Sequence, residues 1–201
     1  MRLTESPGDK CGIFGVYGNP EATTLTYLGL YALQHRGQEG AGIVSWDGET
    51  MRAHRGVGLV ADVFKPHRLA NLTGDIAIGH VRYSTFGTNQ LKNVQPLVAD
   101  YARGSMAVCH NGNLVNAARL REKLEDEGAI FHSTTDTGVI IHLIARSKKK
   151  AIRGERDRGF GTSNRGLLDF GHKRGGTGSG TGSFGVQTVV AGPPWRRPRV
   201  G

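Results

Sequence analysis

The sequence has little cysteine and no long apolar run. Only two of its 201 residues are cysteine, and they stand far apart at Cys11 and Cys109. The longest strongly apolar stretch, residues 139–145, is much shorter than the roughly 20 residues that a membrane-spanning helix needs. Residues 1–10 are polar and lack the apolar core of a secretory signal. These absences predict a cytoplasmic protein in a reducing compartment, without a membrane partner.

Signatures of cofactor binding are also missing. The eight histidines are scattered and the second cysteine stands alone, so no set of residues has the spacing of metal ligands. The glycine-rich stretches match neither a phosphate-binding loop nor a dinucleotide-binding fingerprint. We therefore expect no metal site in this chain.

The net charge of +9 is concentrated at one end. Residues 151–201 hold nine lysines or arginines against three acidic residues, a net +6, whereas residues 1–150 hold 17 against 14, a net +3. The same end contains 13 glycines, a composition that buries too little apolar surface to fold. We expect a disordered tail with one strand candidate at 184–191. Arginine-glycine segments can bind single-stranded nucleic acid, but the few irregular aromatic residues do not favour that partner.

Hydrophobic spacing predicts alternating helices and strands before residue 150. In the first helix Leu25 and Leu28 share a face, Asn113 is placed to cap the third helix, and Gly128 to end it. The predicted helices are 22–34, 59–64, 114–127 and 136–147. One predicted strand follows Cys11 directly, and the others cover 43–46, 51–54, 75–83, 94–99 and 105–110. The strands 43–46 and 51–54 are predicted to form a hairpin turned at 47–48.

Cys11 precedes an alternating apolar run, and the ten residues ahead of it contain a Pro7-Gly8 turn signal. Removal of residues 1–10 would make Cys11 the N-terminus. Its α-amino group, with a pKa near 8, would then be suited to accept the thiol proton. The alternative is that Cys11 is a small buried hydrophobic residue.

Four further polar clusters each lie beside glycine at a strand end or turn, although each could be structural when taken alone. With Cys11 they include the ordered motifs Cys-Gly-Ile-Phe-Gly, Leu-Gln-His-Arg-Gly-Gln-Glu, Gly-His-Val-Arg-Tyr-Ser-Thr and His-Asn-Gly-Asn-Leu. Over residues 9–150 the chain resembles the glutaminase domain of the amidophosphoribosyltransferase family. The resemblance implies a leader (1–10), a partial class II glutamine amidotransferase domain (11–150) and a tail (151–201).

The implied fold is α+β, the four-layer αββα sandwich of N-terminal-nucleophile hydrolases, with two antiparallel sheets and incomplete at its C-terminal side. The implied reaction is glutamine hydrolysis through a cysteine thioester. It supplies ammonia for converting phosphoribosyl pyrophosphate to 5-phosphoribosylamine, the first step of de novo purine biosynthesis.

The resemblance also assigns site residues. The implied catalytic group is Cys11 as the nucleophile, with the Asn111 side chain and the Gly112 amide as the oxyanion hole. Four residues are implied to bind glutamine: Arg82 at the α-carboxylate, Asp136 at the α-ammonium, and Arg36 and Tyr83 around the pocket.

Two single residues depart from the family pattern. Gly138 stands where an acidic residue is usual, and Cys109 stands where alanine is common. The larger departure follows Lys150, where neither the remaining sheet strands nor the phosphoribosyltransferase domain is found. A shifted reading frame near residue 150 would account for the tail.

Three alternatives therefore remain open. The chain is a glutamine-hydrolysing enzyme, an inactive fragment that associates with full-length subunits, or the glutaminase domain of a sister enzyme such as glucosamine-phosphate synthase. The family implies a homo-oligomer, Mg²⁺ in the absent phosphoribosyltransferase domain and, in some members, an iron-sulfur cluster. We expect none of these cofactors in this chain.

Overall fold

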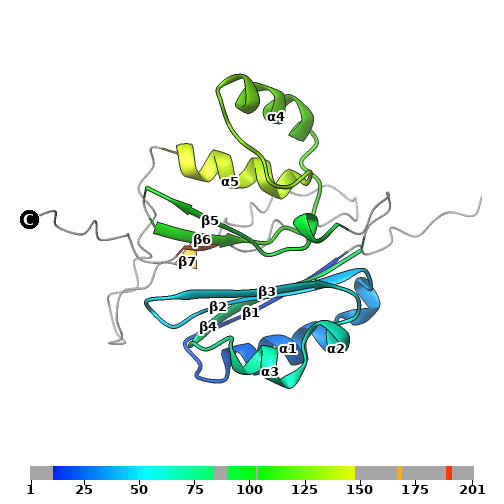
Figure 1. Cartoon of the computed structure of the whole chain (residues 1–201). Helices are drawn as coiled ribbons and strands as arrows, with labels where there is room; N and C mark the ends of the chain where they lie inside the picture. The colour runs from blue at the N-terminus through cyan, green and yellow to red at the C-terminus, as the bar shows by residue number, and fades with distance from the viewer. Residues whose placement is uncertain (1–10, 84–89, 103, 148–166, 169–188, 192–201) are drawn as a thin grey trace, which may run out of the picture.

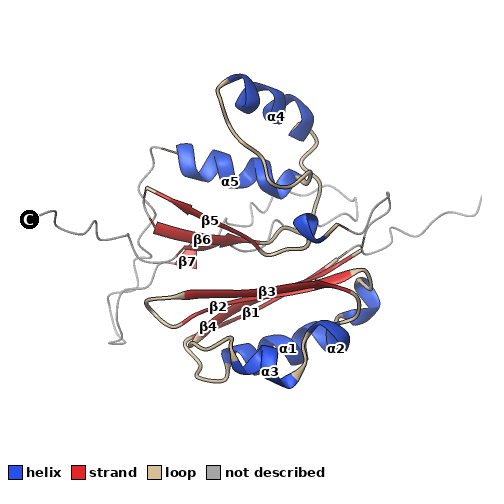
Figure 2. Cartoon of the chain, viewed as in Figure 1, coloured by secondary structure: helices blue, strands red, loops and turns tan. Residues whose placement is uncertain are grey.

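The structure is a computed structural model that describes residues 11–83, 90–102, 104–147, 167–168 and 189–191. Two four-stranded sheets face each other, and helices cover their outer sides (Figure 1 and Figure 2). This is the predicted α+β sandwich of four layers. Ser84, Thr85 and the leader lie outside the described residues.

The first sheet has the order β1-β4-β2-β3, and all neighbouring strands are antiparallel. Gly12 pairs with Val81, so the start of β1 lies beside the end of β4. This register brings Cys11 next to Tyr83. The predicted hairpin is confirmed as β2 and β3. The strands are β1 (Gly12–Tyr17), β2 (Gly40–Trp46), β3 (Met51–Val57) and β4 (Ile76–Arg82).

The second sheet has the order β5-β6-β8-β7. Its strands are β5 (Leu97–Tyr101), β6 (Gly104–Val108), β7 (Leu167–Leu168) and β8 (Val189–Ala191). Strand β8 falls within the strand predicted at 184–191, whereas no strand is predicted at the position of β7. Most of residues 151–201 lie outside the described residues, so the disordered tail and its suspected frame shift stay predictions.

Helices form the two outer layers: α1 to α3 lie on the first sheet, α5 lies on the second sheet, and α4 lies outside α5 (Figure 1). Single 3₁₀ turns precede β2 and β5. The α-helices are α1 (Ala22–Ala32), α2 (Val60–Val63), α3 (Pro66–Ala70), α4 (Ala117–Asp126) and α5 (Asp136–Arg146), and the 3₁₀ turns are η1 (Gln34–Arg36) and η2 (Leu91–Asn93). Helix α4 begins after Asn116 rather than after the predicted cap Asn113, and Gly128 follows its end with a φ of +83°. No helix within the described ranges is long and apolar enough to cross a membrane.

Helix α1 turns Leu25 and Leu28, the leucines predicted to share a face, toward solvent rather than into the core. Leu25 and Leu28 are 38% and 53% exposed, whereas Thr26 and Leu30 are fully buried. The reason is the close approach of helix and sheet: a Cβ at Gly29 would overlap the Phe14 ring of β1, which lies directly below. Thr26, Gly29 and Leu30 therefore form the face of α1 that contacts the first sheet.

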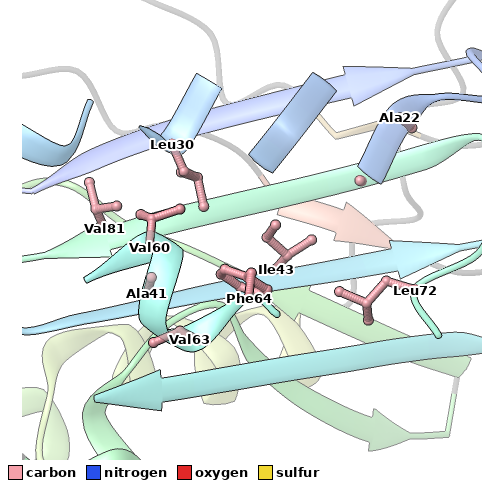
Figure 3. Packing of buried hydrophobic residues seen from close by; sticks show 10 residues of the cluster. Ala22, Leu30, Ala41, Ile43, Val60, Val63, Phe64, Leu72 and Val81 are labelled. Carbon is pink, nitrogen blue, oxygen red and sulfur yellow. The ribbon is translucent and has the colours of Figure 1, made fainter. Parts of the chain in front are cut away.

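Three buried clusters fill the spaces between the layers. The first lies between the first sheet and helices α1 and α2, and includes Leu30, Ile43 and Phe64 (Figure 3). The second lies between the two sheets. The third packs Met106 and Val108 of β6 under α5. The inter-sheet cluster consists of Val44, Trp46, Ile76, Ile78, Ala107 and Cys109.

Replacement of Gly42 in β2 by alanine should destabilise the fold. A Cβ at Gly42 would overlap the Gln95 carbonyl oxygen, so backbone must move, and overpacking of this kind costs about 1–3 kcal/mol. Urea unfolding of the full chain measures the loss. Gly15→Ala in β1 is the matched control, because its Cβ would meet Ile78 at an ordinary 3.4 Å. Equal stability of the two variants would show that the Gly42 contact is unimportant.

Candidate active site

The backbone of Cys11 is fixed by Arg36 of η1. The Cys11 amide donates to the Arg36 carbonyl oxygen at 3.0 Å, and Arg36 Nε donates to the Cys11 carbonyl oxygen at 3.0 Å. Between these bonds Cys11 has a φ of 84°, a left-handed conformation that costs an ordinary residue roughly 1–2 kcal/mol. The sequence motif therefore places Arg36 in direct contact with the predicted nucleophile.

The Cys11 thiol lies against the backbone of Tyr83. The Tyr83 amide donates to Sγ at 3.4 Å, and Sγ is 3.5 Å from the Tyr83 carbonyl oxygen. Partial burial raises the pKa of the Cys11 thiol, and the Tyr83 backbone and Arg82 oppose the rise only in part. With residues 1–10 attached, Cys11 is thus mainly a neutral thiol at pH 7.

Asn111 completes the contacts around Cys11. Its Nδ2 donates to the Cys11 carbonyl oxygen at 3.3 Å, across 100 positions of sequence. The preceding residue is clamped on both sides by one side chain: the His110 amide donates to Gln95 Oε1 at 2.6 Å, and Gln95 Nε2 donates to the His110 carbonyl oxygen at 3.3 Å. A Cβ at Gly112 would lie 2.8 Å from the His110 ring, which explains the glycine at this turn.

Asp136 is the first residue of α5 and faces the same turn. Its Oδ2 accepts the Leu114 amide at 2.9 Å and lies 3.5 Å from His110 Nε2. Burial alone would raise the pKa of the Asp136 carboxyl, but His110 and the amides of Leu114 and Thr137 outweigh it and lower that pKa. The carboxylate is therefore charged at neutral pH and half-buried, as a group that binds a cation should be.

Arg82 and Tyr83 follow one another where β4 ends. One terminal nitrogen of Arg82, Nη1, is buried and has no hydrogen-bond partner among the described residues. The Tyr83 side chain is 47% exposed. A guanidinium with an unused donor suits an anionic ligand.

Three residues that support the site lie outside the predicted set: Gln95, described above, Gln34 and Gly37. Gln34 Nε2 donates to the Gly37 carbonyl oxygen, and its Oε1 accepts the Val60 amide at 2.6 Å. A Cβ at Gly37 would lie 2.7 Å from the Arg82 carbonyl carbon, so the loop needs glycine to approach β4. Gln34 and Gly37 belong to a recognised motif, whereas nothing local in the sequence marks Gln95.

The two departures from the family pattern have physical explanations. A Cβ at Gly138 would lie 2.7 Å from Ser133 Oγ, so the preceding loop leaves little room for a side chain. Cys109 is 1% exposed in the inter-sheet cluster, and burial raises the pKa of its thiol to about 12. Cys109 is therefore a packing residue with an unreactive thiol.

Two surface hollows lie away from Cys11, and no residue of the predicted site lines either. The smaller, about 280 Å³, lies between the start of α1 and the segment after α3. The larger, about 500 Å³, lies beside β3 and is lined by Arg52, Ala53, His54, Arg68, Asn71 and Leu72. No group of three histidine, cysteine or acidic side chains in the described part of the chain is arranged to hold a metal ion.

The structure thus joins four predicted site residues directly, since Arg36, Tyr83 and Asn111 all contact Cys11. Asp136 is connected to this group through the residue that precedes Asn111. Arg82 and Gly112 adjoin it along the chain. The chemical roles of these residues stay predictions.

Comparison with known proteins gives a consistent result. Residues 67–155 match the family described as "Glutamine amidotransferase domain". The chain is 57% identical over 144 residues to amidophosphoribosyltransferase 3, chloroplastic, of Arabidopsis thaliana, covering 72% of this chain and 27% of that protein. It is 52% identical over 141 residues to an amidophosphoribosyltransferase of Staphylococcus epidermidis, covering 70% and 28%.

A solved structure agrees with these relatives. The glutamine phosphoribosylpyrophosphate amidotransferase from B. subtilis, complexed with ADP and GMP, matches with a TM-score of 0.64 and 51% identity. The match covers 69% of this chain and 30% of that one. The chain therefore spans less than a third of the length of the relatives it matches.

Alkylation of the leader-bearing chain by iodoacetamide should report the raised pKa of Cys11. Because thiolate is the reactive form, the rate should be low at pH 7 and should still increase above pH 9. Mass spectrometry of peptides locates the label. The Cys11→Ser variant is the control, since buried Cys109 should stay unlabelled. A rate that levels off below pH 8 would contradict this description of the site.

Proposed function

We propose that this chain hydrolyses glutamine with Cys11 as the nucleophile. It contains a glutamine amidotransferase domain like the N-terminal part of amidophosphoribosyltransferases. The observation that carries the proposal is the convergence of three distant segments on this one residue. Arg36, Tyr83 and Asn111 each bond to Cys11.

Maturation is the first step of the proposal. The Cys11 nitrogen is a peptide amide while residues 1–10 are attached, and it donates to the Arg36 carbonyl oxygen. Removal of the leader converts this nitrogen to an α-amino group at the same place. Such a group is partly neutral near pH 8 and can accept the thiol proton. Removal of residues 1–10 also removes the peptide bond that defines the φ of 84° at Cys11.

The chemical steps then follow in order. The Cys11 sulfur attacks the side-chain amide carbon of glutamine, and its proton passes through the α-amino group to the leaving nitrogen, which departs as ammonia. The resulting thioester is hydrolysed by water to glutamate and free thiol. Negative charge on the amide oxygen is stabilised by the Asn111 side chain and the Gly112 amide, and loss of one such donor typically lowers kcat by about 10²–10³.

Recognition of the rest of glutamine falls to charged side chains. Arg82, with its buried unused nitrogen, is proposed to bind the α-carboxylate. Asp136, held charged at the start of α5, is proposed to bind the α-ammonium. Tyr83 and Arg36 are proposed to form the wall beside the nucleophile.

The wider role is also a proposal, because the chain spans less than a third of its relatives. We propose that the ammonia serves the conversion of phosphoribosyl pyrophosphate to 5-phosphoribosylamine in purine biosynthesis, within a homo-oligomer. We propose a cytoplasmic location and no metal or iron-sulfur cluster in this chain. The plant relatives are named chloroplastic, so fractionation tests the location.

Replacement of Cys11 by serine should abolish glutamine hydrolysis. Intact mass first shows whether residues 1–10 have been lost, and ammonia and glutamate release are then measured on the mature chain. We expect Cys11→Ser to lower kcat at least about a thousandfold. Cys109→Ala is the matched control and should retain activity, because the thiol it removes is buried and inert.

Two outcomes would contradict the proposal. Hydrolysis that persists in Cys11→Ser would assign the chemistry elsewhere. A folded, mature chain that releases no ammonia would favour a role in association with other subunits.

A further inference from the structure

His110 is a buried residue that has no role in the proposed mechanism. It is 6% exposed, and neither ring nitrogen has a hydrogen-bond partner among the described residues. Burying an imidazole without partners is costly, so a purely structural role would favour an apolar residue. Its nearest charged group is Asp136, whose Oδ2 lies 3.5 Å from Nε2.

Both ends of this contact are held in place. Gln95 clamps the His110 backbone through its amide and its carbonyl oxygen. Gly112 leaves room for the ring, because a Cβ there would lie 2.8 Å from it. On the other side, the Leu114 amide fixes Oδ2 of Asp136 at 2.9 Å. The imidazole therefore lies between the start of α5 and the turn at Asn111 and Gly112, which is proposed to form the oxyanion hole.

The neighbouring His80 provides a contrast. It is fully buried, and burial together with the Arg82 charge lowers its pKa to about 3, so it is neutral at physiological pH. It lies beside the His110 backbone and adds no positive charge near the carboxylate. Of these two buried histidines, His110 is the one whose ring approaches Asp136.

We propose that His110 is a positioning residue that acts through Asp136, holding Oδ2 together with the Leu114 amide so that Oδ1 faces the α-ammonium of glutamine. The inference rests on the proposed glutamine-binding function of the site. The contact of 3.5 Å is longer than a good hydrogen bond, and contacts of this kind often tighten when substrate binds. Because His110 directly precedes Asn111, His110 would link the binding of the α-ammonium at Asp136 to the position of the proposed oxyanion hole.

Steady-state kinetics with two substrates separate positioning from general support. His110→Phe keeps a ring but removes both nitrogens, and His110→Gln keeps a donor. We expect His110→Phe to raise KM for glutamine on the order of tenfold with a smaller change in kcat, and His110→Gln to recover most of the loss. With glutaramate, which is glutamine without its α-amino group, the wild-type chain and His110→Phe should agree within about twofold. His67→Phe, on exposed α3, is the control and should match the wild-type chain.

A second measurement is independent of activity. The pKa of the Asp136 carboxyl, followed by carbon-13 NMR, should lie below the ordinary 3.8 in the wild-type chain and move upward in His110→Phe. A depressed pKa adds stability above the ordinary value that is lost as pH falls through the folded-state pKa. His110→Phe should therefore lose less stability than the wild-type chain on acidification from pH 6 to pH 3. If His110→Phe does not fold, His110→Ala carries the same expectation.

The outcomes are distinguishable. An unchanged Asp136 pKa in the His110 variants, or equal losses with glutamine and glutaramate, would overturn the positioning role. Absence of hydrolysis in the wild-type chain would overturn the proposed function, while the NMR titration would still decide whether His110 holds Asp136.

Discussion

The hydrogen bonds on the Cys11 backbone are the constraint on which the site depends. They connect the residue before β1 to Arg36 and to the Asn111 side chain. The Tyr83 amide donates a further hydrogen bond to the Cys11 sulfur. These partners come from η1, from the end of β4 and from the turn after β6. Cys11, the proposed nucleophile, can therefore have all of these contacts only when both sheets are folded and stacked.

The contact between the sheets is made by backbone as well as by apolar side chains. Gly42 of β2 lies directly under the Gln95 carbonyl, and Arg55 Nη1 donates to the Val94 carbonyl oxygen at 3.0 Å. The Gln95 side chain then fixes the residue before Asn111. A polar connection thus runs from Gly42 and Arg55 of the first sheet through the 94–96 segment to His110, the residue before Asn111.

Local patterns in the sequence predict most of the architecture. Hydrophobic spacing predicts the β2–β3 hairpin, β4 and α5, because each depends on residues close together in sequence. The family resemblance implies that Arg36 and Asn111 lie near Cys11. The buried face of α1 does not follow, since the outward position of Leu28 is set by close packing of the helix on Phe14. The hydrogen bonds of Gln95 to the His110 backbone could not be predicted either, because His110 lies 15 residues away on another segment.

The most direct test of the account is mass spectrometry of the mature chain after reaction with 6-diazo-5-oxonorleucine, a glutamine analogue that alkylates a nucleophile at a glutamine site. We predict a single adduct on Cys11 that excess glutamine prevents, with Cys109 unmodified. An adduct on Cys109 or one insensitive to glutamine, or a mature, folded chain that forms none, would contradict the claim that Cys11 is the nucleophile of a glutamine-binding site.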